Sequence, residues 1–206
     1  MKTGKNFLYR TITGALFLIA AAGFTACGNV EKDGEATFIG VNKDGSIRSE
    51  IVENFAEERY DKDELQTAIL GELAVYNKKA GNNITVEKVE KDGDNIVVKM
   101  TYAKSADYAA FNKVDFFAGT AAEAGEAGYE LNVVLSGVED SKETVGKSDI
   151  LAMENTGILI TDVTDSIVLD GKALYTSDGV EVSSKGKTVR RIGEEKKLMY
   201  VIYSIK

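Results

Sequence analysis

Glycine-containing turns, in a chain without proline, are the feature that most constrains the fold. Without proline, tight turns depend on Gly, Asn and Asp, which tolerate a positive φ or bond to their own backbone. Asp-Gly pairs recur between apolar segments, at 44–45, 92–93, 170–171 and 178–179. Asp-Gly is a preferred hairpin turn. The sequence therefore predicts a succession of β-hairpins.

Two hairpins with a helix between them are predicted in the first half of the chain. The four predicted strands are 36–41, 46–55, 84–89 and 95–102. Between the hairpins, Asp61 precedes a segment, 62–80, whose apolar residues recur at helical spacing and which Gly81 ends. Asp61 is a good N-cap residue, and Glu64 stands where a capping box needs it.

Shorter elements follow. Ser105 and Thr120 can each cap a short helix, with a brief extended piece at 116–117 between them. Residues 36–137 are therefore predicted to be an α+β domain, an antiparallel sheet of hairpins covered by helices in ββαββα order. The polar, turn-rich segment 136–149 is the predicted boundary.

Residues 138–206 are predicted to be a small all-β part. Six strand candidates alternate with turns and no helix is expected: 157–161, 166–169, 173–176, 180–183, 188–192 and 198–205. This spacing favours a β meander or half-barrel. The part is either separate from the first domain or packed on it.

The N-terminus has the pattern of a secretion signal. Basic residues, Lys2, Lys5 and Arg10, precede an apolar run from Ile12 to Phe24. The alternative is an uncleaved membrane helix, but the run is shorter than the roughly 20 residues that a span requires. Residues 1–26 are therefore predicted to be removed.

The residues Phe24-Thr25-Ala26-Cys27 resemble a bacterial lipobox, with Phe24 in place of the usual leucine. The resemblance implies cleavage before Cys27, a diacylglyceryl group on its thiol, and a tether over 27–35. It places the protein on the extracytoplasmic face of the cell membrane, or on the outer membrane in a Gram-negative cell, because Gly28 stands where a retention signal has aspartate. The order of blocks is similar to that of small envelope lipoproteins of low-GC Gram-positive bacteria, a resemblance that carries no activity.

Composition excludes several chemistries. Histidine and tryptophan are absent and Cys27 is the only cysteine, which removes Ser-His-Asp and Cys-His catalysis, His-ligated zinc and disulfides. The net charge is −8, and it becomes more negative once the basic leader is removed. Nucleic acid is therefore not expected as a partner. No catalytic residue, cofactor or metal is predicted.

Acidic clusters offer two weak alternatives. Five carboxylates lie together in the sequence: Glu57, Glu58, Asp61, Asp63 and Glu64. Two carboxylates facing each other across a cleft could hydrolyse a glycoside, although acids at a helix N-terminus also favour the helix dipole. Two further groups could bind calcium or simply form turns: Asp92, Asp94 and Asn95, and Asp162, Asp165 and Asp170.

Two Gly-Lys-Ser/Thr segments, 146–148 and 186–188, resemble the end of a phosphate-binding loop. Both lack its first glycine, and neither is expected to join a strand to a helix. Ser184 and Lys187 match a Ser-x-x-Lys pair but are expected in a turn rather than at a helix start.

Basic residues near the C-terminus form the candidate contact site. Lys185, Lys187, Arg190 and Arg191, together with the aromatic Tyr175, could contact a wall polymer or another envelope protein. The sequence thus predicts a membrane-anchored extracytoplasmic lipoprotein that acts as a non-enzymatic binding module. A structural envelope spacer and a carboxylate-based, glycosidase-like enzyme are the alternatives.

Overall fold

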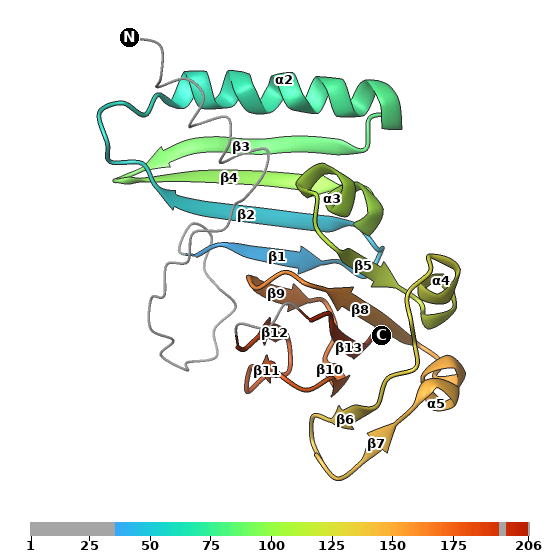
Figure 1. Ribbon diagram of the computed structural model, residues 1–206. Coiled ribbons are helices and arrows are strands. Elements are labelled where there is room, and N and C mark those ends of the chain that lie inside the picture. The colour runs from blue at the N-terminus through green and yellow to red at the C-terminus, as the bar shows by residue number, and fades with distance from the viewer. Residues whose placement is uncertain (1–35, 194–196, 206) are drawn as a thin grey trace.

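The computed structural model describes residues 36–193 and 197–205 (Figure 1). Within these residues the protein is mostly β, with thirteen strands in two sheets. Sheet A has seven strands in the order β11-β12-β9-β1-β2-β4-β3, and sheet B has six in the order β5-β8-β13-β10-β6-β7. The predicted signal peptide and tether, including Cys27, lie outside the described residues.

The elements have the following bounds. Sheet A contains β1 (Phe38–Val41), β2 (Ile47–Asn54), β3 (Ile84–Asp92), β4 (Asn95–Tyr102), β9 (Ser166–Leu169), β11 (Val180–Val182) and β12 (Thr188–Arg191). Sheet B contains β5 (Phe116–Gly119), β6 (Leu135–Gly137), β7 (Thr144–Val145), β8 (Thr156–Thr161), β10 (Ala173–Thr176) and β13 (Met199–Ser204). The helices are α2 (Lys62–Ala80), α3 (Ser105–Asn112), α4 (Ala121–Glu126) and α5 (Lys147–Ala152).

Sheet A is built from the predicted hairpins. The β1–β2 turn has Gly45 at φ 82° and the β3–β4 turn has Gly93 at φ 58°, a left-handed region that glycine enters without strain. β2 pairs with β4 and thereby joins the two hairpins, while β1 pairs in parallel with β9 from much later in the chain. Sheet A therefore combines both predicted parts of the chain.

Sheet B is buried on both faces at its centre. In β8 and β13, alternate residues enter two different cores: Leu159 and Val201 belong to the core shared with sheet A, whereas Ile158 and Ile202 belong to a second core with α4 and α5. All four side chains are almost fully buried. The sequences of these strands are therefore continuous apolar segments, rather than segments in which apolar and polar residues alternate.

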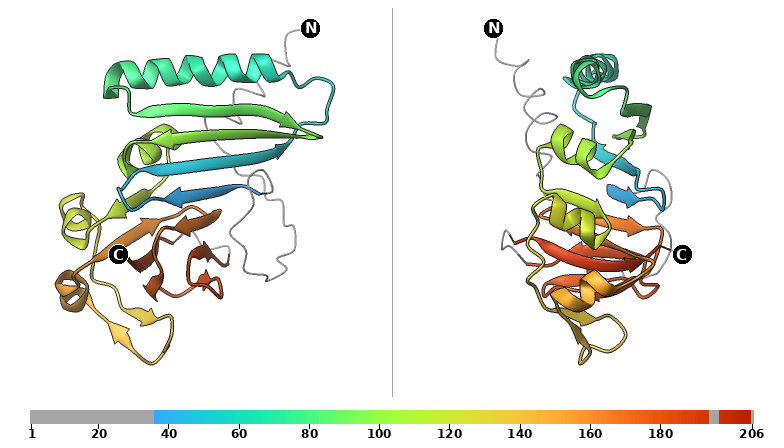
Figure 2. Two further views of the ribbon diagram at one scale, coloured as in Figure 1. Left: turned by 180° about the vertical axis from the view of Figure 1, so that it is seen from behind. Right: turned by 90° about the vertical axis from the view of Figure 1, so that its right-hand side faces the viewer.

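Sheet A is covered on one face by two different layers. Residues of sheet B and residues of α2 and α3 enter the same core as the inner face of sheet A. The helix α2 lies along β3 at the outer edge of the sheet, while α3 lies beside the end of β4 and contacts β5 (Figure 2). Sheet B covers the part of sheet A that the helices do not.

The structure confirms the predicted bounds of α2 and its Asp61 cap, but it shows no capping box with Glu64. Asp61 caps it with its side chain, and Gly81 follows its last residue at φ 88°. Leu65, Ile69 and Leu73 are buried against the sheet, as the helical spacing predicts. Thr120 and Glu123 form a complete capping box at the start of α4.

One helix was not expected. The structure has α5 immediately after β7, and the Gly146 N–H donates to the Asp149 carboxylate at its start (2.9 Å). The prediction that 146–148 does not join a strand to a helix is therefore wrong. The helix has only six residues, and Asp149 already engages its first turn.

The predicted fold class is wrong. The described chain is not an α+β domain with helices covering a sheet in ββαββα order, followed by a small all-β part; it is mostly β, with two large sheets. The strand candidates after residue 138 exist, but they do not form a separate meander. β9, β11 and β12 extend sheet A, whereas β8, β10 and β13 build sheet B. Their apolar residues face both cores, so a second sheet covers much of the first sheet in place of helices.

Candidate functional site

The outer face of sheet A, the face turned away from the shared core, carries most of the polar side chains of its strands. Alternation along each strand sends every second residue to this face. Its central members are Phe38, Gly40, Arg48, Glu50, Val52, Val97, Lys99 and Thr101. Glu181 and Arg190 continue the same face onto β11 and β12, because their neighbours Val182 and Val189 enter the core.

Arg48 is an exposed cation on this face. Its guanidinium carbon lies 5.3 Å from the centre of the Phe38 ring, a cation–π distance. Its side chain crosses directly over Gly40, its register partner on β1. A Cβ on Gly40 would lie 2.2 Å from Arg48 Nε, so only glycine permits this path. The aromatic ring and the glycine together hold the Arg48 side chain across the sheet.

The other described arginines have carboxylate or carbonyl partners. Arg59 contacts Glu57 (2.6 Å), Arg190 pairs with Glu181 (2.7 Å), and Arg191 Nη1 donates to the Lys197 carbonyl (2.8 Å). No such contact of Arg48 exists within residues 36–193 and 197–205. Its donors thus remain available to an anionic group, which a guanidinium binds in a fixed, planar geometry.

Beside Arg48 lies an ion pair between β2 and β4. Glu50 and Lys99 are register partners, and their charged atoms lie 3.2 Å apart with little exposed surface. Desolvation offsets much of the Coulombic gain of such a pair. Next to it, the Thr101 hydroxyl donates to Glu87 of β3. Polar contacts between neighbouring strands therefore continue across this half of the outer face.

The predicted basic residues do not form one cluster. Lys185 and Lys187 are exposed in the β11–β12 turn. Arg190 lies on the outer face, whereas Arg191 follows Val189 on the opposite one. Tyr175 belongs to sheet B, and its hydroxyl donates to Glu143. The strand period of two separates the adjacent arginines.

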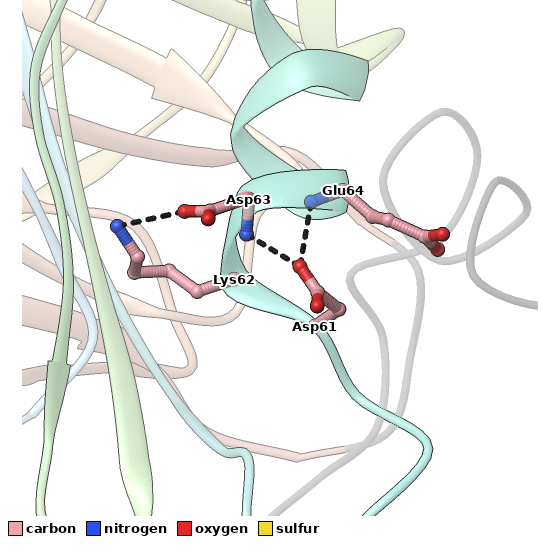
Figure 3. Close-up of polar contacts among 4 residues, drawn as sticks. All are labelled: Asp61, Lys62, Asp63 and Glu64. Atoms are coloured by element: carbon pink, nitrogen blue, oxygen red, sulfur yellow. Dashed lines mark hydrogen bonds and ion pairs between the residues drawn. The ribbon is translucent and has the colours of Figure 1, made fainter.

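Asp61 and Asp63 make local contacts at the start of α2 (Figure 3). One Asp61 oxygen accepts the N–H groups of Asp63 (2.8 Å) and Glu64 (2.9 Å). Lys62 pairs with Asp63 at 3.0 Å. The Glu64 side chain points away from these contacts. The cluster is a helix cap and not a pair of carboxylates facing each other.

A different pair of carboxylates interacts at the loop between β8 and β9. Burial raises the pKa of Asp165. The pKa of Glu53, at the end of β2, is raised first by desolvation and then by the charge of Asp165. Both groups therefore hold their protons to a higher pH than an ordinary carboxyl group.

The predicted calcium ligands are used in turns and loops. Asp92, Asp94 and Asn95 surround the β3–β4 turn. Asp162 accepts the Asp115 N–H (3.2 Å), and Asp170 accepts the N–H of residue 43 (3.3 Å). Within the part of the chain that the structure describes, no group of three acidic residues could hold a metal ion. No described helix is long and apolar enough to cross a membrane.

Comparison with known proteins gives no match: no protein-family model, curated protein or solved structure is significantly similar to this chain. The site is therefore argued from its own geometry.

The sequence analysis does not predict Arg48 as a site residue, nor does it predict that Phe38 and Gly40 lie against its side chain. The predicted hairpin has a different register, because a turn at 42–45 pairs Gly40 with Ile47, whereas the loop in the structure includes residue 46 and Gly40 pairs with Arg48. A glycine in a strand marks a close approach of some other group. That the group is the Arg48 side chain, and that Phe38 lies beneath its guanidinium, requires the structure.

Proposed function

We propose that this chain is a lipid-anchored, extracytoplasmic interaction module that binds an acidic envelope protein through Arg48 on the outer face of sheet A. The proposed location of the protein rests on the signal pattern and on the resemblance of residues 24–27 to a lipobox. Cys27 attaches the protein to the membrane, on the extracytoplasmic face of the cell membrane or on the outer membrane of a cell with two membranes. Two or three acyl chains give stable anchoring.

The observation that carries the binding role is the exposed Arg48 guanidinium stacked on Phe38. Arginine and aromatic residues are enriched at the centres of protein interfaces. Gly40 leaves room for the Arg48 stem to lie flat beside the Phe38 ring, an arrangement that reduces the side-chain entropy lost on binding. These features favour a protein partner with a carboxylate at the contact. The module is non-enzymatic in this proposal and needs no cofactor.

A second candidate is carboxylate-based hydrolysis. It is favoured by Glu53 and Asp165, whose raised pKa values suit a general acid. Glycoside hydrolysis needs one protonated and one ionised carboxyl group across the bond to be cleaved. Loss of a wall-degrading activity of the full-length protein in Glu53→Gln, with unchanged stability, would favour this candidate over the binding module.

The anchor is tested by metabolic labelling. Cells that produce the full-length chain and are fed labelled palmitate should incorporate label into the wild-type protein and not into Cys27→Ser. Label retained by Cys27→Ser would contradict the lipid anchor. The same variant should move from the membrane fraction to the soluble extracytoplasmic fraction.

The binding face is tested by photo-crosslinking in intact cells. A benzoylphenylalanine probe replaces Thr101, the register partner of Arg48, and a control probe replaces the exposed Lys172 near sheet B. The proposal expects one discrete protein adduct from the probe at 101 and none from the probe at 172. A polydisperse adduct that wall-degrading enzymes remove would show that the partner is a wall polymer and not a protein. The absence of any adduct would favour a spacer role.

A further inference from the structure

A second surface lies on the outward side of α2. Leu65, Ile69 and Leu73 direct one side of this helix into the core. The opposite side carries a stripe of five exposed residues, which we call the α2 stripe: Glu64, Thr67, Gly71, Val75 and Lys78. Val75 is 60 % exposed, and Leu70 beside the stripe is 46 % exposed. Figure 1 places α2 at the outermost position of the molecule, beyond β3.

The α2 stripe has a symmetric spacing. Its members follow one another at intervals of three, four, four and three residues, so they share one side of a 3.6-residue helix. Gly71 is the centre of this series. A helix running in the opposite direction therefore presents the same stripe in register: Gly71 meets Gly71, Thr67 meets Val75, and Glu64 meets Lys78. A surface of this kind is complementary to a second copy of itself.

Charge selects the antiparallel arrangement. Glu64 lies in the first turn of α2 and Lys78 in the last. Antiparallel pairing brings opposite charges together at both ends of the contact and also opposes the two helix dipoles. Parallel pairing would instead place like charges side by side, which disfavours association.

No contact among the described residues requires a glycine at position 71. Gly71 is an interior helical residue without a positive φ, and a Cβ built on it would meet nothing within 4 Å. Glycine at such a position costs about 1 kcal/mol relative to alanine. The distance between packed helices depends on the side chains at their contact, and glycine permits the shortest one. A second helix at this point explains the glycine and also covers the exposed Val75.

We propose that two copies of the protein associate through the α2 stripe, with the two helices antiparallel about a two-fold axis at Gly71. This contact lies on α2 and not on the outer face of sheet A around Arg48, so the two proposals stand or fall separately.

Cysteine crosslinking tests the axis. Single cysteines at Gly71, Lys78 and Ala122 are introduced into the full-length protein, where Ala122 is an exposed position on α4 that controls for random collision. A crosslinker with an arm below about 10 Å should join Gly71→Cys to itself. Lys78→Cys should not react with itself, because the rise of 1.5 Å per residue places the two copies about 21 Å apart along the axis. Co-produced Glu64→Cys and Lys78→Cys should join to each other.

Two results would overturn the proposal: no more dimer from Gly71→Cys than from Ala122→Cys, or self-crosslinking of Lys78→Cys, which indicates parallel helices.

Charge exchange tests the ends of the contact. Lys78→Glu should weaken association of the purified full-length protein in detergent by roughly tenfold, because it places like charges together at both ends. The matched control Lys79→Glu changes the same turn outside the stripe and should leave association unchanged. The double variant Glu64→Lys/Lys78→Glu restores opposite charges and should restore the dimer. A double variant as weak as Lys78→Glu, with wild-type helix content by circular dichroism, contradicts the proposal.

Discussion

The same device, a glycine beneath a side chain of the neighbouring strand, occurs in both sheets with different consequences. In sheet B, Gly157 lies beneath the buried ring of its register partner Tyr203. In sheet A, Gly40 lies beneath the exposed side chain of its register partner Arg48. The first pair lies in the core that sheet B shares with sheet A. The second positions a cation at the surface. Sheet B therefore acts as the scaffold, and the outer face of sheet A is the proposed binding surface.

The largest expected effect is in sheet B. In Gly157→Ala the new Cβ would lie 2.4 Å from Tyr203 Cζ, and the ring has no solvent into which it can move. We expect a loss of about 3 kcal/mol in the free energy of unfolding, typical of overpacking in a core. Urea denaturation measures it. Gly157→Ala/Tyr203→Leu should recover part of the loss, and an unchanged single variant would contradict the packing described here.

A smaller effect is expected where α2, rather than sheet B, covers sheet A. Asp61→Ala removes the side chain that accepts two N–H groups at the start of α2. The expected loss is about 1 kcal/mol, the usual value of an N-cap. Asp61→Asn, which keeps an accepting oxygen, is the control and should lose less. Equal losses for the two variants would argue against the cap.

The loop between β8 and β9, one of the segments that connect the two sheets, should make stability depend on pH. Burial raises the folded-state pKa of Asp165 above its ordinary value of 3.8. The folded state therefore binds this proton more tightly than the unfolded state, and stability falls as the pH rises through the folded pKa. Asp165→Asn should be more stable than wild type at neutral pH and should lose that advantage in acid. Thermal melts over pH 3–7 measure the difference.

The same substitution should change Glu53. The charge of Asp165 is the second cause of the raised Glu53 pKa, after desolvation. Asp165→Asn should therefore lower the Glu53 pKa toward its ordinary range, which carboxyl NMR titration follows. An unchanged Glu53 pKa would show that the charge of Asp165 does not affect Glu53.

The smallest effect on stability is expected at the outer face of sheet A. In Gly40→Ala the clash is with a flexible, exposed side chain, so the free energy of unfolding should change by less than about 0.5 kcal/mol. Arg48 must nevertheless leave Gly40 and the Phe38 ring. The proposed partner contact should be lost in a protein of nearly normal stability. A loss in the free energy of unfolding as large as that of Gly157→Ala would contradict the difference proposed between the two sheets.

The sequence predicted local structure better than architecture. Asp61 and Gly81 mark the ends of α2, and Gly45 and Gly93 mark two hairpins, because each depends on backbone conformations that few residues favour. The parallel pairing of β1 with β9 depends on residues more than a hundred positions apart, and no local pattern indicates it. For that reason the sequence leaves open whether residues 138–206 are separate from the first domain or packed on it, and it does not predict that they contribute strands to both sheets.

The candidate site shows the same limit. The basic residues chosen from the sequence include Arg190 and Arg191, which are adjacent in the chain but lie on opposite faces of β12. Arg48 stands alone among uncharged and acidic neighbours in the sequence, so no local pattern indicates it. Its setting comes from the register of β1 against β2, which brings Gly40 and Phe38 beneath it.

The most direct test of the binding face compares two arginines that stack on aromatic rings. Arg48 and Arg59 each lie 5.3 Å from a ring centre, but Arg59 is bonded to Glu57 in the loop before α2. The adduct of a photo-crosslinking probe at Thr101 is measured in intact cells carrying Arg48→Ala or Arg59→Ala in the full-length protein. We predict that Arg48→Ala abolishes the adduct and that Arg59→Ala leaves it at the wild-type level. An adduct that survives Arg48→Ala, or that both variants reduce equally, would contradict a binding site on the outer face of sheet A.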